Sequence, residues 1–374
     1  MPNKRLKCMV CGAAIPNGAA VCPVCGAGAD QFTLADSPDT SFRRDTNRRF
    51  IIAGAGVAGV SAAAAIRDRD NTASIVLLDA EDHLPYHRPM LTKTLLGARP
   101  VEGLVIHDES WYARRRVTRI TGQRAESVRV AEKTLKLESG AELLYDVCIL
   151  AMGASSFIPP IPGADARNAF AIRSLDDAIR LESAARQSRH AAVIGGGALG
   201  LEAAWALREG GLKVSVIETL PRLLDRKVTE STSAALADWL DRSGIDLSLG
   251  ARVEAIETVD GKAIAVRLSG GRTIPTDIVI ISAGITPNAK AAESSGIKVE
   301  RGVVVDERML SSAPDVYACG DCAIFGGVRY GLWPEAEAMG AVAGANAAGD
   351  NRSYSRAPLP DVITALGDFI VRGA

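Results

Sequence analysis

Two stretches of the chain decide its fold: RFIIAGAGVAGVSAAAAIRD at 49–68 and HAAVIGGGALGLEAAWALRE at 190–209. In each, a short apolar run precedes a glycine-rich loop, and a run rich in alanine and leucine follows it. The two stretches align at one constant offset, which matches Gly54, Gly56 and Gly59 with Gly195, Gly197 and Gly200. This repeat predicts two copies of a unit made of a strand, a glycine loop and a helix.

An acidic residue completes each copy. The run IVLLD ends at Asp79 and the run VSVIE ends at Glu218. In such units glycine permits a tight turn and a close backbone approach, the helix N-terminus faces a pyrophosphate, and the carboxylate accepts ribose hydroxyls. The sequence therefore predicts two dinucleotide sites. A carboxylate at Glu218 would repel a 2′-phosphate, which favours NADH over NADPH, although Arg222 leaves NADPH open.

The wider pattern agrees with a doubly wound fold. From Phe50 onward, apolar strand-like runs alternate with alanine-rich helical stretches, as in a parallel α/β sheet. The chain has 36 glycines and only 5% aromatic residues, which suits a fold with many close backbone approaches. We expect an α/β protein with two Rossmann-like domains.

Charge and hydropathy argue against two classes of partner. The 43 Lys and Arg residues nearly balance the 44 Asp and Glu residues, giving a net charge of −1, so neither nucleic acid nor an anionic membrane is favoured. The longest apolar runs, such as 147–151 and 278–283, are far shorter than the ~20 residues that span a bilayer. The N-terminus lacks the apolar run of a secretory signal, so we expect a cytoplasmic protein.

The first 34 residues form a separate cysteine-rich module. Two C-x-x-C-G motifs supply Cys8, Cys11, Cys22 and Cys25. Four thiolates at this spacing predict a tetrahedral metal site. Such a site suits either iron or zinc, and the spacing does not choose between them.

Five further stretches carry a resemblance to a known family. They are LPYHRPMLTK at 84–93, YDVCILAMGA at 145–154, DIVIISAGITPN at 277–288, VYACGDCA at 316–323 and LWPEAEAMG at 332–340. With the glycine loops, they make residues 48–349 resemble the pyridine-nucleotide flavin oxidoreductases. That family includes rubredoxin reductases, ferredoxin reductases of oxygenases and the flavin part of nitrite reductases. The cysteine module resembles rubredoxin-like domains and also short zinc ribbons.

The resemblance implies roles for particular residues. The first loop with Asp79, Arg88 and Asp321 would bind FAD, and the second loop with Glu218 would bind NADH. Gly284, in the third of the five stretches, is implied as a further cofactor contact. Lys93 would lie at the N5 edge of the flavin, paired with Glu202, and these two are the predicted catalytic residues.

Cysteine chemistry at the flavin is not expected. Relatives that reduce disulfides or peroxide carry a redox cysteine soon after the first acid, whereas this chain has no cysteine between Cys25 and Cys148. Cys148 lies in an apolar run and is interpreted as a small buried hydrophobic residue. The C-x-x-C pair Cys319 and Cys322 replaces small residues in the FAD motif.

These observations divide the chain into six segments. We expect a metal module (1–34), a linker (35–47), a first FAD-binding part (48–157), an NAD-binding domain (158–283), a second FAD-binding part (284–349) and a short tail (350–374). The tail matches only the beginning of the interface domain of relatives, so that domain is expected to be truncated. A flexible linker of about 13 residues would span ~20 Å and let the module swing.

The expected function is electron transfer. NADH would pass hydride to FAD, which would release single electrons to a rubredoxin-like iron site and then to an acceptor protein such as rubredoxin or rubrerythrin. Iron is favoured over zinc in the module, because the module is fused to a chain that resembles reductases of rubredoxin. The alternatives are an NADH oxidase or a reductase of an external carrier, with a structural zinc ribbon, and a non-catalytic redox sensor whose ribbon binds a partner.

Overall fold

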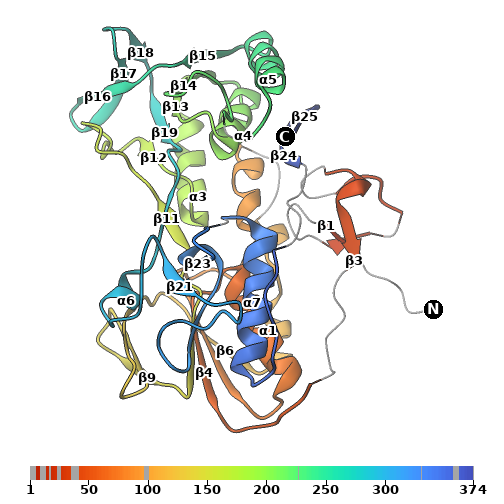
Figure 1. Ribbon diagram of the computed structural model, residues 1–374. Helices are drawn as coiled ribbons and strands as arrows, with labels where there is room; N and C mark the ends of the chain where they lie inside the picture. Colours follow the sequence, from red (N-terminus) through yellow and green to blue (C-terminus); the bar gives the residue numbers. More distant parts are fainter. Residues whose placement is uncertain are drawn as a thin grey trace.

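Two five-stranded parallel sheets form the framework of the protein. The computed structural model describes residues 6–8, 14–16, 18–22, 27–34, 42–96, 101–225, 227–329, 331–356 and 362–373. In Figure 1 the first sheet lies in the lower half of the view with helices α1 and α7, and the second lies in the upper half with α4 and α5. The α/β fold with Rossmann-like sheets expected from the repeat is therefore confirmed.

The first sheet has the strand order β22-β10-β4-β5-β6, with all neighbours parallel. It joins strands far apart in the chain, because β22 follows the whole second sheet in sequence. Its elements are β4 (Arg49–Ala53), β5 (Ser74–Leu78), β6 (Val117–Ile120), β10 (Val147–Leu150), β22 (Val316–Ala318), α1 (Val57–Arg69), α2 (Glu109–Arg114) and α7 (Trp333–Ala347).

The second sheet has the order β12-β19-β13-β14-β15 and is also parallel throughout. Its elements are β12 (Ala169–Phe170), β13 (His190–Ile194), β14 (Lys213–Glu218), β15 (Ile245–Leu249), β19 (Ile278–Ile281), α3 (Leu175–Ala185), α4 (Ala198–Glu209) and α5 (Glu230–Arg242). The chain passes between the two sheets along the antiparallel pair β11 (Ala154–Ser156) and β20 (Ile285–Pro287).

Smaller elements surround the two sheets. Two antiparallel sheets consist of β7 (Ala125–Arg129), β8 (Thr134–Leu137) and β9 (Glu142–Leu144), and of β16 (Val253–Val259), β17 (Lys262–Leu268) and β18 (Thr273–Pro275). The remaining short elements are β21 (Val303–Val305), β23 (Ala323–Phe325), α6 (Lys290–Glu293), η2 (Arg88–Met90), η3 (Thr92–Thr94), η4 (Val101–Leu104) and η5 (Gly320–Cys322).

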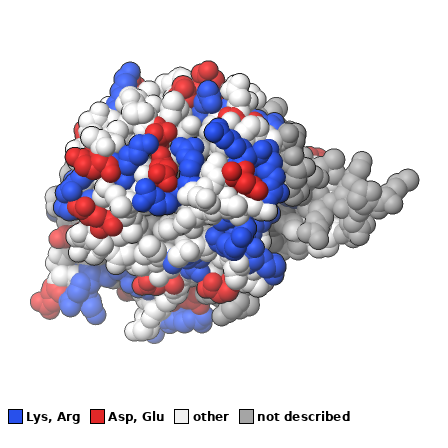
Figure 2. Space-filling model, turned by 90° about the horizontal axis from the view of Figure 1, so that it is seen from below, with Lys and Arg blue, Asp and Glu red and all other residues white. Residues whose placement is uncertain are grey.

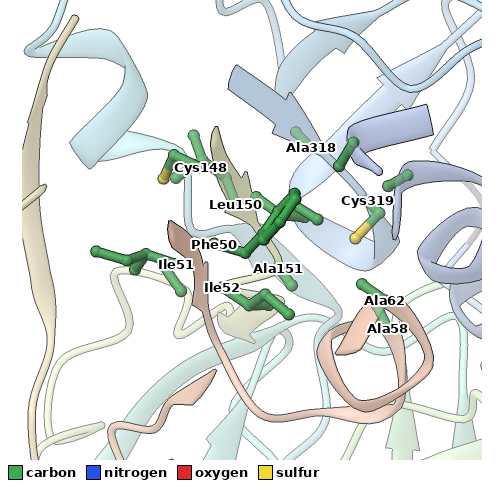
Figure 3. Packing of buried hydrophobic residues seen from close by; sticks show 14 of the residues in the cluster. Phe50, Ile51, Ile52, Ala58, Ala62, Cys148, Leu150, Ala151, Ala318 and Cys319 are labelled. Carbon is green, nitrogen blue, oxygen red and sulfur yellow. The ribbon is translucent and has the colours of Figure 1, made fainter. Parts of the chain in front are cut away.

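The core of the first sheet is built from aliphatic strands and a close helix pair. Figure 3 shows Phe50, Ile52 and Leu150 of the strands facing Ala58 and Ala62 of α1, and these five side chains are all buried. Helix α7 packs directly on α1. A Cβ atom added at Gly340 would lie 2.1 Å from the Ala58 carbonyl oxygen, so the helices can approach this closely only with glycine there.

The N- and C-terminal segments lie side by side (Figure 1). The N-terminal module contains β1 (Leu6–Cys8), β2 (Ala14–Ile15), η1 (Ala29–Gln31) and β3 (Phe32–Leu34), with sheet order β2-β1-β3. The C-terminal segment forms an antiparallel hairpin of β24 (Val362–Leu366) and β25 (Phe369–Arg372).

Part of the expected flexible linker is bound to the first sheet's helix α1. The Arg44 amide N–H donates to the Arg69 carbonyl oxygen (2.9 Å), and Asp45 Oδ1 accepts from the Asn71 amide (2.8 Å). Thr46 also bonds to Asp70 and Thr72, so Arg44, Asp45 and Thr46 are held at the end of that helix and do not act as a free tether. The bounds of the linker stay a prediction. Residues 35–41 lie outside the described residues.

Charged residues are mixed over the surface. Figure 2 shows Lys and Arg interspersed with Asp and Glu on the face seen from below. This distribution agrees with the near-zero net charge. Within the part of the chain that the structure describes, no helix is both long and apolar enough to cross a membrane.

Candidate functional site

The first glycine loop connects β4 to α1 with very little space around its backbone. Gly54 has φ +115°, and a Cβ atom there would lie 2.2 Å from the Ala151 carbonyl oxygen. A Cβ at Gly59 would lie 1.9 Å from the Gly54 carbonyl oxygen. Gly56, the N-cap of α1, instead faces open space. The loop thus leaves the helix N-terminus accessible, and this geometry fits a pyrophosphate.

Asp79 lies directly after β5, at the same edge of the sheet. Burial raises the pKa of Asp79 to about 6, and the nearby Glu81 carboxylate acts in the same direction. The Glu81 amide N–H donates to Asp79 Oδ1 (3.1 Å), which favours the ionised form. An ionised carboxylate at this point could accept ribose hydroxyls, as the sequence predicts.

Beside Asp79, two buried polar atoms lack a hydrogen-bond partner among the described residues. They are the Tyr112 hydroxyl and Arg119 Nε. The two residues border a cavity of about 460 Å³ that Asp82 and Thr121 also line. An unsatisfied buried polar group costs ~1–3 kcal/mol, so a ligand that supplied partners here would stabilise the protein. These atoms fit the polar adenosine half of FAD.

Arg88 and Asp321 are each held by a residue that the sequence argument did not single out. Arg88 Nη2 lies 2.8 Å from Glu81 Oε1, and its guanidinium lies over the Tyr86 ring. Asp321, in η5, pairs with Arg173 at 2.7 Å. The Arg88–Glu81 pair lies within the first half, whereas Arg173, between β12 and α3 of the second half, reaches across to Asp321. The contacts of Arg88 and Asp321 with FAD remain predictions.

The second glycine loop, between β13 and α4, repeats the geometry of the first. Gly195 has φ +117°, and a Cβ there would lie 2.2 Å from the Ser282 carbonyl oxygen. Gly197 is the N-cap of α4 and faces open space. At Gly200 a Cβ would lie 2.2 Å from the Gly195 carbonyl oxygen. The second loop fits a pyrophosphate for the same reason as the first.

Glu218, at the end of β14, turns its carboxylate toward this loop. Its oxygens accept from the Gly196 amide (2.7 Å) and from the Leu220 amide (2.8 Å). Arg222 pairs with Asp225 at 2.7 Å. Gly284 follows β19 with φ +108° and open space around it. This arrangement holds a carboxylate in place for a ribose. Arg222, the residue that left NADPH open, is paired with Asp225.

Lys93 and Glu202 come together between the two halves. Lys93 is in η3, which follows the first loop, α1 and β5 along the chain, whereas Glu202 is in α4, which starts at the second loop. Lys93 Nζ lies 3.4 Å from Glu202 Oε1, and both side chains are mostly buried. Glu202 also accepts hydrogen bonds from the Thr92 hydroxyl (2.6 Å) and the Thr364 hydroxyl (2.5 Å). The carboxylate therefore links three segments of the chain: η3, α4 and the strand that contains Thr364.

The described part of the cysteine module includes two of its four cysteines. Cys8 and Cys22 are both buried, whereas Cys11 and Cys25 lie outside the described residues. Within the described ranges no cluster of three or more His, Cys, Asp or Glu residues could hold a metal ion. The four-cysteine metal site thus stays a prediction.

The remaining cysteines are buried in the core of the first half. Cys148, Cys319 and Cys322 are each fully inaccessible. Burial raises the pKa of Cys148 to about 12 and that of Cys322 to about 11, which keeps both as thiols. The interpretation of Cys148 as a small hydrophobic residue agrees with this environment (Figure 3).

Sequence reasoning missed Arg173, Glu81, Thr92 and Thr364. A weak signal existed for Arg173, because it directly precedes SLDD, and Ser174 with Asp177 forms a capping box at the start of α3. Thr364 had no signal, because its contact with Glu202 spans 162 residues of sequence.

Comparison with known proteins agrees with this geometry. The family model described as pyridine nucleotide-disulphide oxidoreductase matches residues 48–340. The nitrite reductase [NAD(P)H] of Bacillus subtilis is 35% identical over 286 residues, which are 76% of this chain but 35% of that relative. The NADH-rubredoxin oxidoreductase of Clostridium acetobutylicum is 31% identical over 323 residues, which are 86% of this chain and 80% of that one.

A solved structure extends the comparison to the fold. The ferredoxin reductase for the CYP199A2 system from Rhodopseudomonas palustris superposes with a TM-score of 0.80 at 32% identity, covering 83% of this chain and 79% of that one. The family match begins at residue 48 and leaves the cysteine module outside it. From residue 48 onward, the two glycine cradles and these matches agree: the chain belongs to the pyridine nucleotide-disulphide oxidoreductase family and is an NAD(P)H-dependent flavoprotein oxidoreductase.

Proposed function

We propose that this protein transfers electrons from NADH, by way of bound FAD, to an iron ion in the N-terminal four-cysteine site and then to an acceptor protein such as rubredoxin or rubrerythrin. The observation that carries the proposal is the Lys93–Glu202 ion pair, which joins the two glycine-loop halves at 3.4 Å. The similarity to an NADH-rubredoxin oxidoreductase supports the choice of acceptor.

In this proposal each half of the molecule binds one cofactor. The first loop, Asp79, Arg88 and Asp321 hold FAD, while the second loop, Gly284 and Glu218 hold NADH. FAD supplies hydride acceptance and the release of electrons one at a time. Glu218 accepts hydrogen bonds from the Gly196 amide of the second glycine loop and from the Leu220 amide that follows β14, so its carboxylate is held where a 2′-phosphate would have to lie. NADH is therefore the favoured donor.

Lys93 and Glu202 then have an electrostatic role. We assign to the Lys93 ammonium the stabilisation of negative charge that develops when hydride arrives. Glu202 keeps the ammonium in position and offsets its desolvation, because a buried cation without a partner is costly. The two threonine hydroxyls in turn hold Glu202 in one orientation.

The metal assignment depends on the thiolates of the module. Two of the four cysteines are buried: Cys8 ends strand β1, and Cys22 follows Val21, which forms an isolated β-bridge with Gly28. Buried thiolates need a cation nearby, and a tetrahedral set of four suits iron as well as zinc. Iron is proposed because only iron would give the module a redox function.

Elemental mass spectrometry of the purified holoprotein, expressed with iron supplied, tests the proposal. We expect about one iron per flavin, and anaerobic NADH should bleach the visible absorption of the iron site after that of the flavin. Zinc at the same ratio would contradict the internal carrier. It would leave an NADH oxidase or a reductase of an external carrier, which oxygen consumption without any added carrier would separate.

A further inference from the structure

The N-terminal module lies against the C-terminal hairpin and against α7 (Figure 1). Two ion pairs join them: Arg372 Nη1 of β25 lies 3.3 Å from Asp30 Oδ2, and Lys7 Nζ lies 3.4 Å from Glu337 Oε2 of α7. The Gln31 side-chain amide donates to Asp30 Oδ2 (3.1 Å), which orients this carboxylate. Both pairs connect elements at opposite ends of the sequence.

An apolar contact accompanies the ion pairs. Cys8, Ile15 and Cys22 of the module belong to one continuous buried cluster. The same cluster includes Met90 and Leu91 next to Lys93, and Leu366 and Val371 of the hairpin. The module is therefore seated where the hairpin meets the segment that carries Lys93.

The hairpin also reaches the candidate catalytic pair. Thr364 of β24 donates to Glu202, and Thr364 is the cross-strand partner of Val371, the neighbour of Arg372. On its other side the hairpin is anchored to the second half, because Phe369 packs on Trp239 with ring centroids 5.2 Å apart. One short hairpin thus contacts both the module and the carboxylate that pairs with Lys93.

We infer that the β24–β25 hairpin is a docking surface for the four-cysteine module, and that it holds the module beside the Lys93–Glu202 pair while electrons leave the flavin. The second half of this inference rests on the proposed function. Arg372 and Asp30 are each about half exposed, with side-chain accessibilities of 53% and 51%, so their ion pair adds little binding energy. Because the module is tethered to the body, docking does not need a high intrinsic affinity, and the module can still be released to an outside acceptor.

Hydrogen–deuterium exchange of the holoprotein tests docking without requiring a redox-active metal. Arg372→Glu and Asp30→Arg should each increase exchange both in the hairpin (362–373) and in the described strands of the module. The double variant that combines Asp30→Arg with Arg372→Glu should return exchange toward that of the parent. Arg129→Glu is the matched control, because the Arg129–Glu142 pair has accessibilities of 47% and 43% in another sheet.

Stopped-flow reduction by NADH tests the electron-transfer half on the same variants. Arg372→Glu should slow reduction of the metal site about two- to fivefold, while flavin reduction keeps its rate, and added salt should slow the parent protein similarly. Val371→Asp, which places a charge in the buried cluster that the hairpin shares with the module, should raise exchange in the module more than the single-charge variants do. If neither Val371→Asp nor the two single-charge variants raise exchange in the module, docking on the hairpin is wrong. If exchange rises but metal-site reduction does not slow, the hairpin does not serve electron transfer. A metal site that NADH cannot reduce even in the parent contradicts the proposed function instead, and the exchange result still decides docking.

Discussion

Glu202 holds the proposed catalytic lysine in place and is itself held by two threonine hydroxyls. Its two carboxylate oxygens meet Lys93, Thr92 and Thr364, which come from the first half and the C-terminal hairpin. Because these partners approach from different elements, the position of Lys93 depends on how the two halves meet. A charge change at Glu202 should therefore act on the reaction through Lys93.

We predict that Lys93→Ala and Glu202→Gln both slow flavin reduction by NADH, Lys93→Ala by roughly a hundredfold, because a positioned charge is lost. Glu202→Gln keeps a hydrogen-bond acceptor for the threonines while removing the carboxylate charge. Anaerobic stopped-flow absorbance measures the rate. Lys136→Ala is the matched control, because it breaks the Lys136–Glu126 pair (2.8 Å) in a sheet outside the site. Unchanged kinetics in both site variants would contradict the assigned role.

Asp79 gives a pH-dependent prediction. Its pKa is about 6 in the folded protein against 3.8 for the ordinary group, so between these values the folded state holds a proton that the unfolded state has lost. The free energy of unfolding of the flavin-free protein therefore falls as pH rises through this window. The Asp79→Asn variant cannot ionise at this position, so its free energy of unfolding does not fall in this way. Its stability relative to the parent should increase by about 1 kcal/mol from pH 5 to pH 7.5.

Urea unfolding of both flavin-free proteins across this pH range measures the difference. The same variant should bind FAD more weakly at pH 7.5, because it lacks the carboxylate proposed to accept the ribose hydroxyls. A stability difference that does not change with pH would contradict a raised pKa at Asp79.

At the scale of elements, the two helices next to the first loop are packed backbone to backbone. Gly340 and Gly344 of α7 face the carbonyl oxygens of Ala58 and Ala62 of α1. Because α1 starts at the glycine loop, any displacement of α7 is transmitted to the proposed FAD pyrophosphate site. The LWPEAEAMG motif thus has a packing role as well as its family resemblance.

Gly340→Ala should destabilise the protein by about 1–3 kcal/mol and lower its FAD content, since the added methyl group would overlap a backbone oxygen. Alanine is the better helix former, so helix propensity alone would give the opposite sign. Chemical unfolding and the flavin-to-protein absorbance ratio measure the two effects. Ala341→Ser, one residue further along the same helix, should change stability little, and an equal loss in both variants would contradict the steric explanation.

The elements differ in how well their sequences predict them. The two strand-loop-helix units could be predicted because their signal is local: glycines at fixed spacing after an apolar run. The helix pair and the hairpin could not be predicted in place, because their partners are distant in sequence. The Lys93–Glu202 pair was expected from the family resemblance, but the two threonines that hold Glu202 lie 110 and 162 residues away from it. A local sequence pattern cannot predict contacts between residues so far apart in the chain.

At the scale of the whole molecule, the cysteine module and the flavoprotein body are expected to be separable in function. The family match covers residues 48–340, and the glycine cradles with Lys93 and Glu202 all lie within it. Donor oxidation should therefore depend on the body, whereas passage of electrons to the outside carrier should depend on the module.

We predict that Cys8→Ser and Cys22→Ser lower the metal content while leaving FAD content and NADH oxidation with ferricyanide near those of the parent. Transfer to an added rubredoxin should fall in proportion to the metal lost. Elemental analysis and the two acceptor assays on one preparation provide the measurements. Cys148→Ser controls for cysteine loss in general, and it should keep the metal although it disturbs a buried site. Full transfer to rubredoxin without metal would show that the body reduces this carrier directly.

The order of strands in the first sheet also constrains how the protein is made. Strand β22 covers the edge of β10, but its residues Val316–Ala318 leave the ribosome long after Val147–Leu150. The strands of the second sheet, by contrast, lie together between residues 169 and 281. At ribosomal speeds of ~5–20 residues per second, β22 is synthesised on the order of ten seconds or more after β10. The apolar edge of β10 has no neighbouring strand during that time. During translation the second sheet should therefore close first, while the earlier-made first sheet remains open and exposed to chaperones.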